Sequence, residues 1–457
     1  MATKTNGRLS WGEKISYGFG DCAANVYVAL SGTFYTGFLT DTVGIAAAAA
    51  GTMMLVARVF DGATDLMMGA VVDKTKSKYG KARPWLLWTA PFMMIGLILM
   101  FMNPANSNGG KLAYTYFSYI FMNCIVYTAN NLPFNALLSR MTLDVQDRAE
   151  TASARFIMTQ ITTLVVNVFA TNAIATIGTE GAFWTWTKLT VVLGLVEIVM
   201  LLICFFGCKE HVGESSTGEV VIKEVPFKEA LPALMKNKYF FLQALLFMLI
   251  YINVVGVGSL TYYFCAGVMG NLALLTNTSI CNALPAVAAN FFNPVLVKKF
   301  GKRKVMIGAS IVSIIGAAIV GLGGTSLNLT LVYVGLVLKA LANGPLMTGL
   351  FAMTADVVDY GEWKTGIRSE GLVNSCTSFG MKVGIGLGSF VSTLFLTFGG
   401  YVGTAEVQTQ KALDSITFGF GYFSAVMAVI TLIIVLLMNI DKYLPEIEKT
   451  LKAKDRT

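Results

Sequence analysis

The stretch that decides the fold is Met54-Leu-Val-Ala-Arg58-Val-Phe-Asp61-Gly-Ala-Thr64-Asp65-Leu-Met-Met-Gly69. It lies inside an apolar run from about Ile45 to Val72. This run is long enough to cross a bilayer, because a spanning helix needs roughly 20 residues. Three charged side chains therefore fall near the middle of a membrane helix, where each costs about 2.5–3.5 kcal/mol.

These three charges share one face of the helix. Asp61 and Asp65 are four residues apart, and Arg58 and Asp61 are three apart. Such a face must point into the protein or toward a water-filled path. Since Arg58 can neutralise only one carboxylate, we expect a cation or a proton to match the other. The alternative is a buried ion pair with a purely structural role.

The composition indicates a polytopic membrane protein embedded in a lipid bilayer. Of 457 residues, 55% are hydrophobic and 13% are charged, whereas soluble domains carry about 25% charged residues. We expect no cleavable signal, because the first sixteen residues are polar and lead directly into a spanning segment. The net charge of +8 is spread over short loops, so we expect no nucleic-acid partner.

The reactive side chains favour neither an enzyme nor a cofactor-binding protein. The seven cysteines lack metal-ligand or disulfide spacing, and the single histidine, His211, lies in a loop. No nucleophile–base pair is apparent in the sequence. We therefore expect no cofactor, and no metal beyond a cation at the helix of Asp61.

Twelve spans are predicted, and the longest polar loop divides them into two groups of six. We expect an N-terminal six-helix bundle over 1–207, a cytoplasmic linker over 208–238, a C-terminal six-helix bundle over 239–440 and a cytoplasmic tail over 441–457. The predicted fold is thus an all-α membrane protein of twelve transmembrane helices in two bundles, the major facilitator fold. The spans are 17–40, 45–72, 84–103, 113–138, 154–178, 184–207, 239–266, 273–297, 304–324, 329–354, 370–398 and 414–440.

The loops predict the orientation. Basic residues gather between spans 2 and 3 and between spans 8 and 9, whereas the intervening loops hold only isolated lysines. By the positive-inside rule both termini are then cytoplasmic. The two basic groups are Lys74, Lys76, Lys78, Lys81 and Arg83, and Lys298, Lys299, Lys302, Arg303 and Lys304.

Polar residues interrupt several spans where a cavity is expected. Asp21 and Asn25 lie in the first span, and Tyr127-Thr128-Ala-Asn130-Asn131-Leu-Pro133-Phe134-Asn135 lies in the fourth. Asn374, Thr377, Ser378 and Lys382 lie in the eleventh. Amides, hydroxyls and a few charges suit a polyhydroxy ligand. Alternatively, the fourth-span residues hold helices together, Lys382 forms a structural ion pair, and Arg155 is an interfacial anchor.

A segment dense in both charges follows the tenth span. It runs from Ala355 to Glu370 and includes Asp356, Asp359 and Arg368. We interpret it as a latch that pairs with basic residues of the N-terminal half when the cytoplasmic side is closed. The alternative is an ordinary solvated loop.

Taken together, these motifs resemble the glycoside–pentoside–hexuronide:cation symporters, a family that includes the melibiose carriers and the bacterial glucuronide carriers. The resemblance extends from the first span to the eleventh. It rests on Tyr17-Gly-Phe-Gly-Asp21, Tyr35-Thr-Gly-Phe-Leu-Thr-Asp41, Ala57-Arg-Val-Phe-Asp61-Gly-Ala-Thr-Asp65, Gly80-Lys-Ala-Arg-Pro-Trp85, Asn131-Leu-Pro-Phe134 and Asp356-Val-Val-Asp-Tyr-Gly-Glu362.

The resemblance implies cation-coupled uptake of a sugar or glycoside, with a uronide among the candidates, across the inner membrane of a bacterium. It places the cation site at Asp61, Asp65 and Thr128. Thr64 is the fourth predicted member of this site, and it occupies a position that is asparagine in melibiose carriers. The loss of that amide leaves the ion open between Na⁺ and H⁺.

The resemblance also implies the sugar site and the residues that couple and gate it. Asn25 and Asn131 stand where melibiose carriers have aspartates, and Asn135 stands where some relatives stack an aromatic ring on the sugar. The sugar site would comprise Asp21, Asn25, Asn131, Asn135, Arg155, Thr377, Ser378 and Lys382, and coupling or gating would involve Arg58, Asp356, Asp359 and Arg368.

Two other functions remain open. An uncoupled facilitator or exchanger would keep the carboxylates only as remnants, and a sugar sensor on a transporter fold would bind sugar without moving it. A membrane enzyme is the least favoured class. We expect the protein to function as a monomer.

Overall fold

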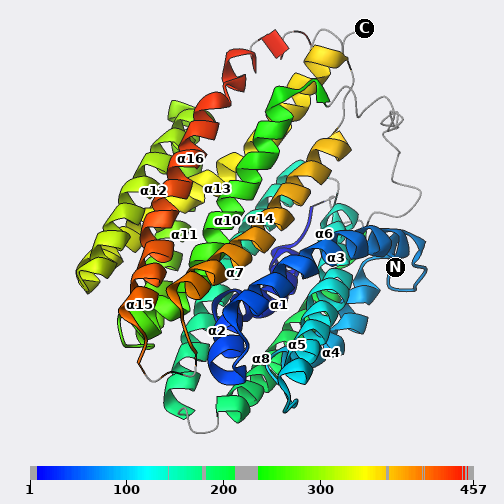
Figure 1. The fold of residues 1–457 in the computed structure, drawn as a ribbon. Helices are drawn as coiled ribbons and strands as arrows, with labels where there is room; N and C mark the ends of the chain where they lie inside the picture. Colours follow the sequence, from blue (N-terminus) through cyan, green and yellow to red (C-terminus); the bar gives the residue numbers. More distant parts are fainter. Residues whose placement is uncertain are drawn as a thin grey trace. The chain divides into compact units, whose positions relative to one another are not determined.

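The computed structural model describes residues 8–450 except 143, 178–181, 212–234, 367–369, 404, 406, 445, 448 and 449. Within these residues the chain is helical and contains no strand. It divides into two compact units (Figure 1). The first unit is Met1–Val220 with Asn271–Ser279 and Tyr401–Gln408, and the second is Val221–Gly270, Ile280–Gly400 and Thr409–Thr457.

The helices of the first half of the chain form the first unit. They are α1 (Trp11–Thr33), α2 (Tyr35–Gly37), η1 (Phe38–Val43), α3 (Ala47–Lys74), α4 (Arg83–Met100), α5 (Asn108–Ile120), η2 (Phe121–Tyr127), α6 (Thr128–Met141), α7 (Val145–Ile177) and α8 (Ala182–Gly207). η1 and η2 are π-helical segments that continue the α-helices before them.

The second unit contains the remaining long helices. They are α10 (Lys238–Tyr263), η3 (Phe264–Val268), α11 (Leu274–Phe300), α12 (Lys302–Thr325), α13 (Leu329–Thr365), α14 (Glu370–Gly399), α15 (Gln410–Thr417), η4 (Phe418–Tyr422), α16 (Phe423–Leu437) and η5 (Ile440–Lys442). The first residues of α11 belong to the first unit. The predicted linker 208–238 is described only at its ends, so its boundaries stay a prediction.

Each of the twelve predicted spans coincides with a helical segment of the described chain. Nine of these segments are long and apolar enough to cross a membrane by length and composition. The three that fall short are α1 to η1, α3, and α5 to α6. These three contain Asp21, Asp61 and Asn131, whereas Arg155 and Lys382 lie in segments among the nine.

Helix pairs in the first unit pack through small residues and aromatic rings. α1 lies against α7 and α8, and α4 lies against α8. At one end of α8, Trp186 is 3% exposed and its ring stacks on Phe101 with centroids 5.3 Å apart. Phe34 and Phe38 contact the same indole edge-on. The cluster fixes α1, α4 and α8 together.

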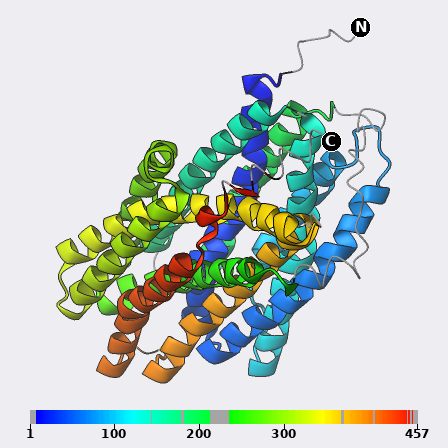
Figure 2. The same ribbon diagram turned by 90° about the horizontal axis from the view of Figure 1, so that it is seen from above.

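In the second unit, α10 and α14 approach backbone to backbone. A Cβ built on Gly380, Gly384 or Gly388 would lie 2.5–2.9 Å from a carbonyl oxygen of α10. Glycines spaced four residues apart therefore let the two helices meet more closely than any side chain allows. α12 and α13 also run side by side (Figures 1 and 2).

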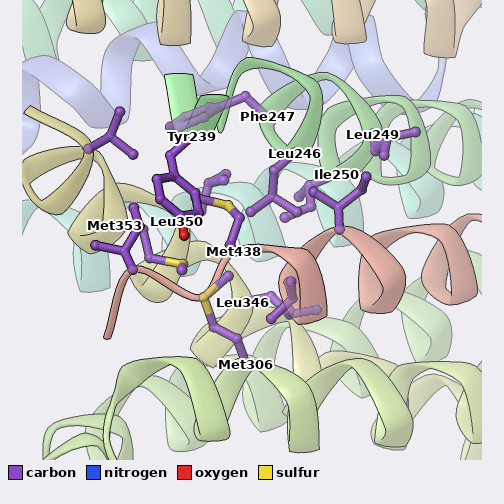
Figure 3. Packing of buried hydrophobic residues seen from close by; sticks show 14 of the residues in the cluster. Tyr239, Leu246, Phe247, Leu249, Ile250, Met306, Leu346, Leu350, Met353 and Met438 are labelled. Carbon is purple, nitrogen blue, oxygen red and sulfur yellow. The ribbon is translucent and has the colours of Figure 1, made fainter. Parts of the chain in front are cut away.

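A hydrophobic cluster completes the second unit (Figure 3). It includes Leu246 and Phe247 of α10, Met306 of α12 and Leu350 of α13. All four are at most 1% exposed. The sulfur-containing side chains fill gaps between the helices, which suits methionine because it is unbranched and flexible.

Candidate functional site

The π-helical segment η2 and the helix α6 carry the centre of the site. η2 ends at Tyr127, α6 begins at Thr128, and Pro133 lies inside α6. A π-turn and a proline both disturb the regular hydrogen-bond ladder, and π-turns occur frequently at functional sites. As a result, one short stretch presents polar groups toward both α3 and α7.

Toward α3, the hydroxyl of Thr128 meets Asp61. Thr128 Oγ1 donates to Asp61 Oδ1 at 3.2 Å, and Arg58 Nη1 lies 3.3 Å from Asp61 Oδ2. Asp61 is 5% exposed. Each oxygen of this buried carboxylate therefore has its own partner, one from its own helix and one from α6.

Tyrosines surround the Arg58 guanidinium. Tyr27, Tyr119 and Tyr127 all interact with it electrostatically, as does Asp61. Tyr27 donates to Asn123 Oδ1 at 2.8 Å, which ties α1 to η2 at this level. Phenol groups lower the cost of holding a charge inside the bundle, because they supply oriented dipoles where water is excluded.

Two other residues predicted for the cation site, Thr64 and Asp65, lie on the same helix. The hydroxyl of Thr64 is within hydrogen-bond distance of the carbonyls of Phe60, at 3.2 Å, and Asp61, at 3.1 Å. Asp65 is half-buried, one turn beyond Asp61. The structure thus joins Asp61 to Thr128 and places Thr64 and Asp65 next to them along α3.

A second charged cluster lies between α1 and α7. Arg155 Nε donates to Asp21 Oδ2 at 2.8 Å, and Nη2 donates to Asp21 Oδ1 at 3.1 Å. Thr159 Oγ1 donates to the same Oδ2 at 2.7 Å. Two parallel bonds between guanidinium and carboxylate form the strongest and most directional kind of protein ion pair.

The guanidinium also reaches α6. Arg155 Nη1 donates to Asn135 Oδ1 at 3.0 Å, and Asn135 Nδ2 donates to Asn131 Oδ1 at 2.7 Å. Arg155 lies over the Phe134 ring at 5.0 Å from its centroid. Asn25 Nδ2 donates to the Asp21 carbonyl. Five predicted sugar-site residues are therefore brought together in one cluster: Asp21, Asn25, Asn131, Asn135 and Arg155.

Tyr127 connects the two clusters. It interacts electrostatically with Asp21 and Arg155 of the first pair and with Arg58 and Asp61 of the second. It is half-buried, and its ring lies 5.1 Å from that of Tyr27. Tyr127 therefore lies within electrostatic range of both pairs.

The residues predicted on α14 belong to the second unit. Thr377 is 7% exposed and donates to the carbonyl of Asn374 at 2.8 Å. Ser378 is exposed, and Lys382 is half-buried. The Thr377 hydroxyl is therefore engaged by its own helix, whereas Ser378 and Lys382 lie on more open faces of α14.

The predicted gating residues occur at the end of α13. Asp356 is 6% exposed and pairs with Lys302 of α12, whose Nζ lies 2.6 Å from Oδ1. Asp359 is half-buried, and Arg368 lies outside the described residues. The ion pair of Asp356 is thus made within the second unit, and the pairing with N-terminal basic residues stays a prediction.

Sequence reasoning missed four members of the site. Thr159, Tyr17, Phe134 and Tyr127 all contact or surround the charged pairs. Two of them carried a signal, because Tyr17 precedes Asp21 by four residues and Thr159 follows Arg155 by four. Residues four apart share a helix face, so each lies on the face of a predicted site residue.

The arrangement suits binding rather than covalent chemistry. It offers a carboxylate, a guanidinium and two amides to a ligand rich in hydroxyls, and carboxylate and hydroxyl oxygens to a hard cation. Among the described residues, no group of three or more His, Cys, Asp or Glu could hold a metal ion. The oxygens of Asp61 and Thr128 are the best-placed candidates for a cation.

Comparisons of sequence and structure agree with this geometry. The family model for MFS/sugar transport proteins matches residues 16–442. An isoprimeverose transporter of Lactiplantibacillus pentosus is 31% identical over 449 residues, which cover 98% of this chain and 92% of that protein. A glucuronide carrier protein homolog of Escherichia coli is 29% identical, over 90% of this chain and 88% of that protein.

Solved structures share the fold. A single-residue mutant of the nucleoside transporter NupG matches with a TM-score of 0.64 and 13% identity over 94% of this chain and 99% of that chain. A bacterial homolog of the human lysosomal transporter Spinster matches with a TM-score of 0.67 and 14% identity over 93% of this chain and 95% of that chain. The predicted all-α major facilitator fold is confirmed, and the family consists of transporters rather than enzymes. The chain is a multi-pass membrane protein that belongs to the MFS/sugar transport protein family, among its glycoside–pentoside–hexuronide:cation symporters.

Proposed function

We propose that this protein carries a sugar or glycoside into a bacterial cell together with Na⁺ or H⁺. The relatives named as an isoprimeverose transporter and a glucuronide carrier homolog support the substrate class. The observation that carries the proposal is the site on α3, where Asp61 bonds Thr128 and pairs with Arg58 inside a span predicted from the sequence. A second carboxyl, Asp65, lies one turn further along the same helix.

The charge of α3 gives the cation its role. Two carboxylates and one guanidinium leave a net negative charge on this helix inside the membrane, and a bound cation cancels it. The Asp61 and Thr128 oxygens are its first ligands, with Asp65 and Thr64 adjacent. Asp61, on α3, contacts Arg58 of the same helix and Thr128 of α6. Cation binding at Asp61 therefore orders α3 and α6 against each other.

The sugar binds at the Asp21–Arg155 pair. The carboxylate accepts hydrogen bonds from sugar hydroxyls, the guanidinium donates to them, and Asn131 and Asn135 do both. Because all four are already linked by hydrogen bonds, the site is largely formed before the sugar arrives.

The two sites communicate through α6. Thr128 faces the cation site and Asn131, three residues later, faces the sugar site. Tyr127 interacts with the charges of both. A cation that fixes Thr128 thereby fixes the helix turn that carries Asn131, and each ligand raises the affinity of the other by the same factor.

One ion per sugar is sufficient for accumulation. A single charge that moves down 100 mV releases about 2.3 kcal/mol. At about 1.36 kcal/mol per tenfold step, this corresponds to a concentration gradient of roughly fiftyfold. The loaded protein then exposes its sites to the cytoplasm by rocking of the two bundles, with both termini on the cytoplasmic side. A monomer is sufficient for this cycle, and the part that Lys382 and Ser378 of α14 play in sugar binding stays a prediction.

The test uses purified protein in liposomes with an imposed cation gradient. Wild type is expected to accumulate sugar, and Asp65→Cys is expected to lose accumulation while it keeps some sugar binding. Lys382→Ala is expected to weaken both the cation and the sugar effects. Asp414→Asn, at an exposed position on α15, is the matched control and should behave as wild type. Unchanged accumulation by Asp65→Cys would contradict the cation-site assignment.

A second candidate function rests on one observation. Because both oxygens of Asp61 already have protein partners, the α3 charges could act as structural remnants in an uncoupled exchanger. That protein would show sugar counterflow between the two sides without any ion movement. A sensor would bind sugar and show neither counterflow nor accumulation.

A further inference from the structure

A carboxyl group far from both charged pairs has no role in the cycle above. Glu197 is the sixteenth of the 26 residues of α8, so it lies near the middle of that span. It is 0% exposed. Neither Oε1 nor Oε2 has a hydrogen-bond partner among the described residues.

The surroundings of Glu197 are apolar. Leu193 and Leu201, one turn before and after it, are 6% and 0% exposed. Gly194, three residues earlier, lies so close to α4 that a Cβ there would meet Met94 at 2.6 Å. The carboxyl therefore lies in a span that packs closely on α1 and α4.

The charged groups on the neighbouring helices are all engaged elsewhere. On α1, Glu13 bonds His211, and Lys14 pairs with Asp147 and Glu150 of α7. Asp21, also on α1, pairs with Arg155 of α7. On α4, Arg83 donates to the Phe205 carbonyl. The Arg83 contact lies toward the C-terminal end of α8. Phe205 is eight residues from Glu197, a rise of about 12 Å along the helix. On α8 itself, Lys188 is nine residues away in the other direction.

A carboxylate in such a place would be an uncompensated charge in an apolar interior, which proteins avoid by taking up a proton. We propose that Glu197 is a proton-binding site of this protein, distinct from the α3 cation site. It holds its proton throughout the transport cycle while α8 stays packed on α1 and α4, and it releases that proton only when this packing opens.

The proposal has a thermodynamic signature. A glutamate in an unfolded chain loses its proton near pH 4.3, whereas the folded protein keeps the proton on Glu197. Above that pH, unfolding therefore releases one proton from this residue, and the folded state loses stability as pH rises. Glu197→Gln is a neutral isostere of the protonated acid, so it has no proton to release at this position. The unfolding constant of the wild type, divided by that of Glu197→Gln, should therefore rise about tenfold per pH unit.

The experiment measures denaturant unfolding of the detergent-purified protein at several pH values between about 5.5 and 8.5. The expected result is that the ratio of the two unfolding constants grows tenfold per pH unit. Glu446→Gln, at an exposed glutamate, is the matched control, and its curve should run parallel to that of the wild type. Parallel curves for Glu197→Gln would overturn the proposal.

A second measurement serves if Glu197→Gln does not fold. Dicyclohexylcarbodiimide reacts with protonated carboxyl groups in apolar surroundings. The acid proton moves to a carbodiimide nitrogen, and the carboxyl oxygen adds to the central carbon of the carbodiimide. This adduct then rearranges to an N-acylurea with no leaving group. Peptide mapping of labelled wild-type protein at about pH 7 should find this adduct on Glu197, whose ordinary pKa is near 4.3. A Glu197 peptide that stays unmodified in protein labelled elsewhere would overturn the proposal.

Transport separates this site from the α3 site. If Glu197 keeps its proton, Glu197→Gln should retain the wild-type ratio of ions to sugar, and a lost or halved ratio would contradict the proposal. The measurement of the ion-to-sugar ratio depends on the proposed function, whereas the unfolding and labelling experiments do not. Failure of coupling in the wild type would therefore leave the Glu197 proposal testable on its own.

Discussion

Replacing Arg155 with lysine tests whether the Asp21–Arg155 pair is the sugar site. The guanidinium makes two bonds to Asp21, at 2.8 and 3.1 Å, and one to Asn135 at 3.0 Å. Lysine keeps the charge but reaches Asp21 with a single ammonium group, so the fork and the contact with Asn135 are lost. The carboxylate is then no longer held in one orientation for the sugar hydroxyls.

The structure sets the size of the effect. A hydrogen bond to a charged group contributes about 1.5–3 kcal/mol. Because the Arg155 side chain is 28% exposed, solvent screening favours the lower end of that range. We expect sugar binding to weaken by about 1.5–2 kcal/mol, or roughly 10- to 30-fold. Arg155→Gln removes the charge and leaves the Asp21 carboxylate, whose side chain is 10% exposed, without its cation. The loss there should exceed about 3 kcal/mol, more than 100-fold.

The assay is isothermal titration of purified protein with a sugar first found by thermal-shift screening of glycosides and uronides. Thr163→Val is the control, because its hydroxyl bonds only the Thr159 carbonyl one turn away, and it should bind sugar as the wild type does. Circular dichroism melting checks that each variant is folded. If Arg155→Lys and Arg155→Gln both bind sugar with wild-type affinity, the sugar-site assignment is wrong.

Three further predictions follow from individual contacts. Thr128→Val removes the bond to Asp61 at 3.2 Å, and the ion concentration for half-maximal sugar binding should then shift about tenfold. If the ion is Na⁺, this concentration should rise, because Na⁺ loses a ligand. If the ion is H⁺, it should fall, because the carboxylate loses a hydrogen-bond donor. Gly384→Ala places a Cβ 2.6 Å from a carbonyl oxygen of α10, whereas Gly258→Ala meets nothing within 4 Å. Thermal denaturation should show a loss of about 1–3 kcal/mol for Gly384→Ala only. Asp147, paired with Lys14, has a lowered pKa because Lys14 hydrogen-bonds its carboxylate; its contribution to stability is present above about pH 3.9 and is lost as pH falls further, so Asp147→Asn should flatten the acid limb of a stability–pH curve.

The fold could be predicted because its signals are local. Apolar runs of spanning length and basic loops depend only on neighbouring residues, and the predicted fold class is confirmed by the family match and the solved structures. The helical spacing of Asp61 and Asp65 likewise placed both on α3 without any knowledge of packing.

The partners of the site residues were harder to predict, because they depend on how helices pack. The spacing of Thr159 placed it on the helix face of Arg155, but it did not indicate that Thr159 of α7 would bond Asp21 of α1, at 2.7 Å. Nor did residue spacing show that Thr64 would bond its own backbone or that Asp356 would pair with Lys302. A side chain on a helix can turn to several neighbours, and only tertiary packing selects one.

Buried groups with no partner are also invisible in a sequence. Glu197 lies in the predicted span 184–207 and Lys339 in the predicted span 329–354, and a side chain near the end of a span can reach the interface. In the structure the Glu197 oxygens and the Lys339 nitrogen are buried without a hydrogen-bond partner among the described residues. Lys339 lies 5.8 Å from the centre of the Phe420 ring, which gives that charge a weak neighbour.

The central claim is that sugar and cation move together through the α3 site, and the current evoked by a rapid sugar jump tests it most directly. Proteoliposomes adsorbed on a solid-supported membrane report charge movement without any knowledge of the ion. The wild type should give an inward current on sugar addition, and Asp61→Asn and Asp65→Asn should abolish that current while some sugar binding remains. Sugar exchange by the wild type with no current and no Na⁺ or H⁺ flux would contradict the account.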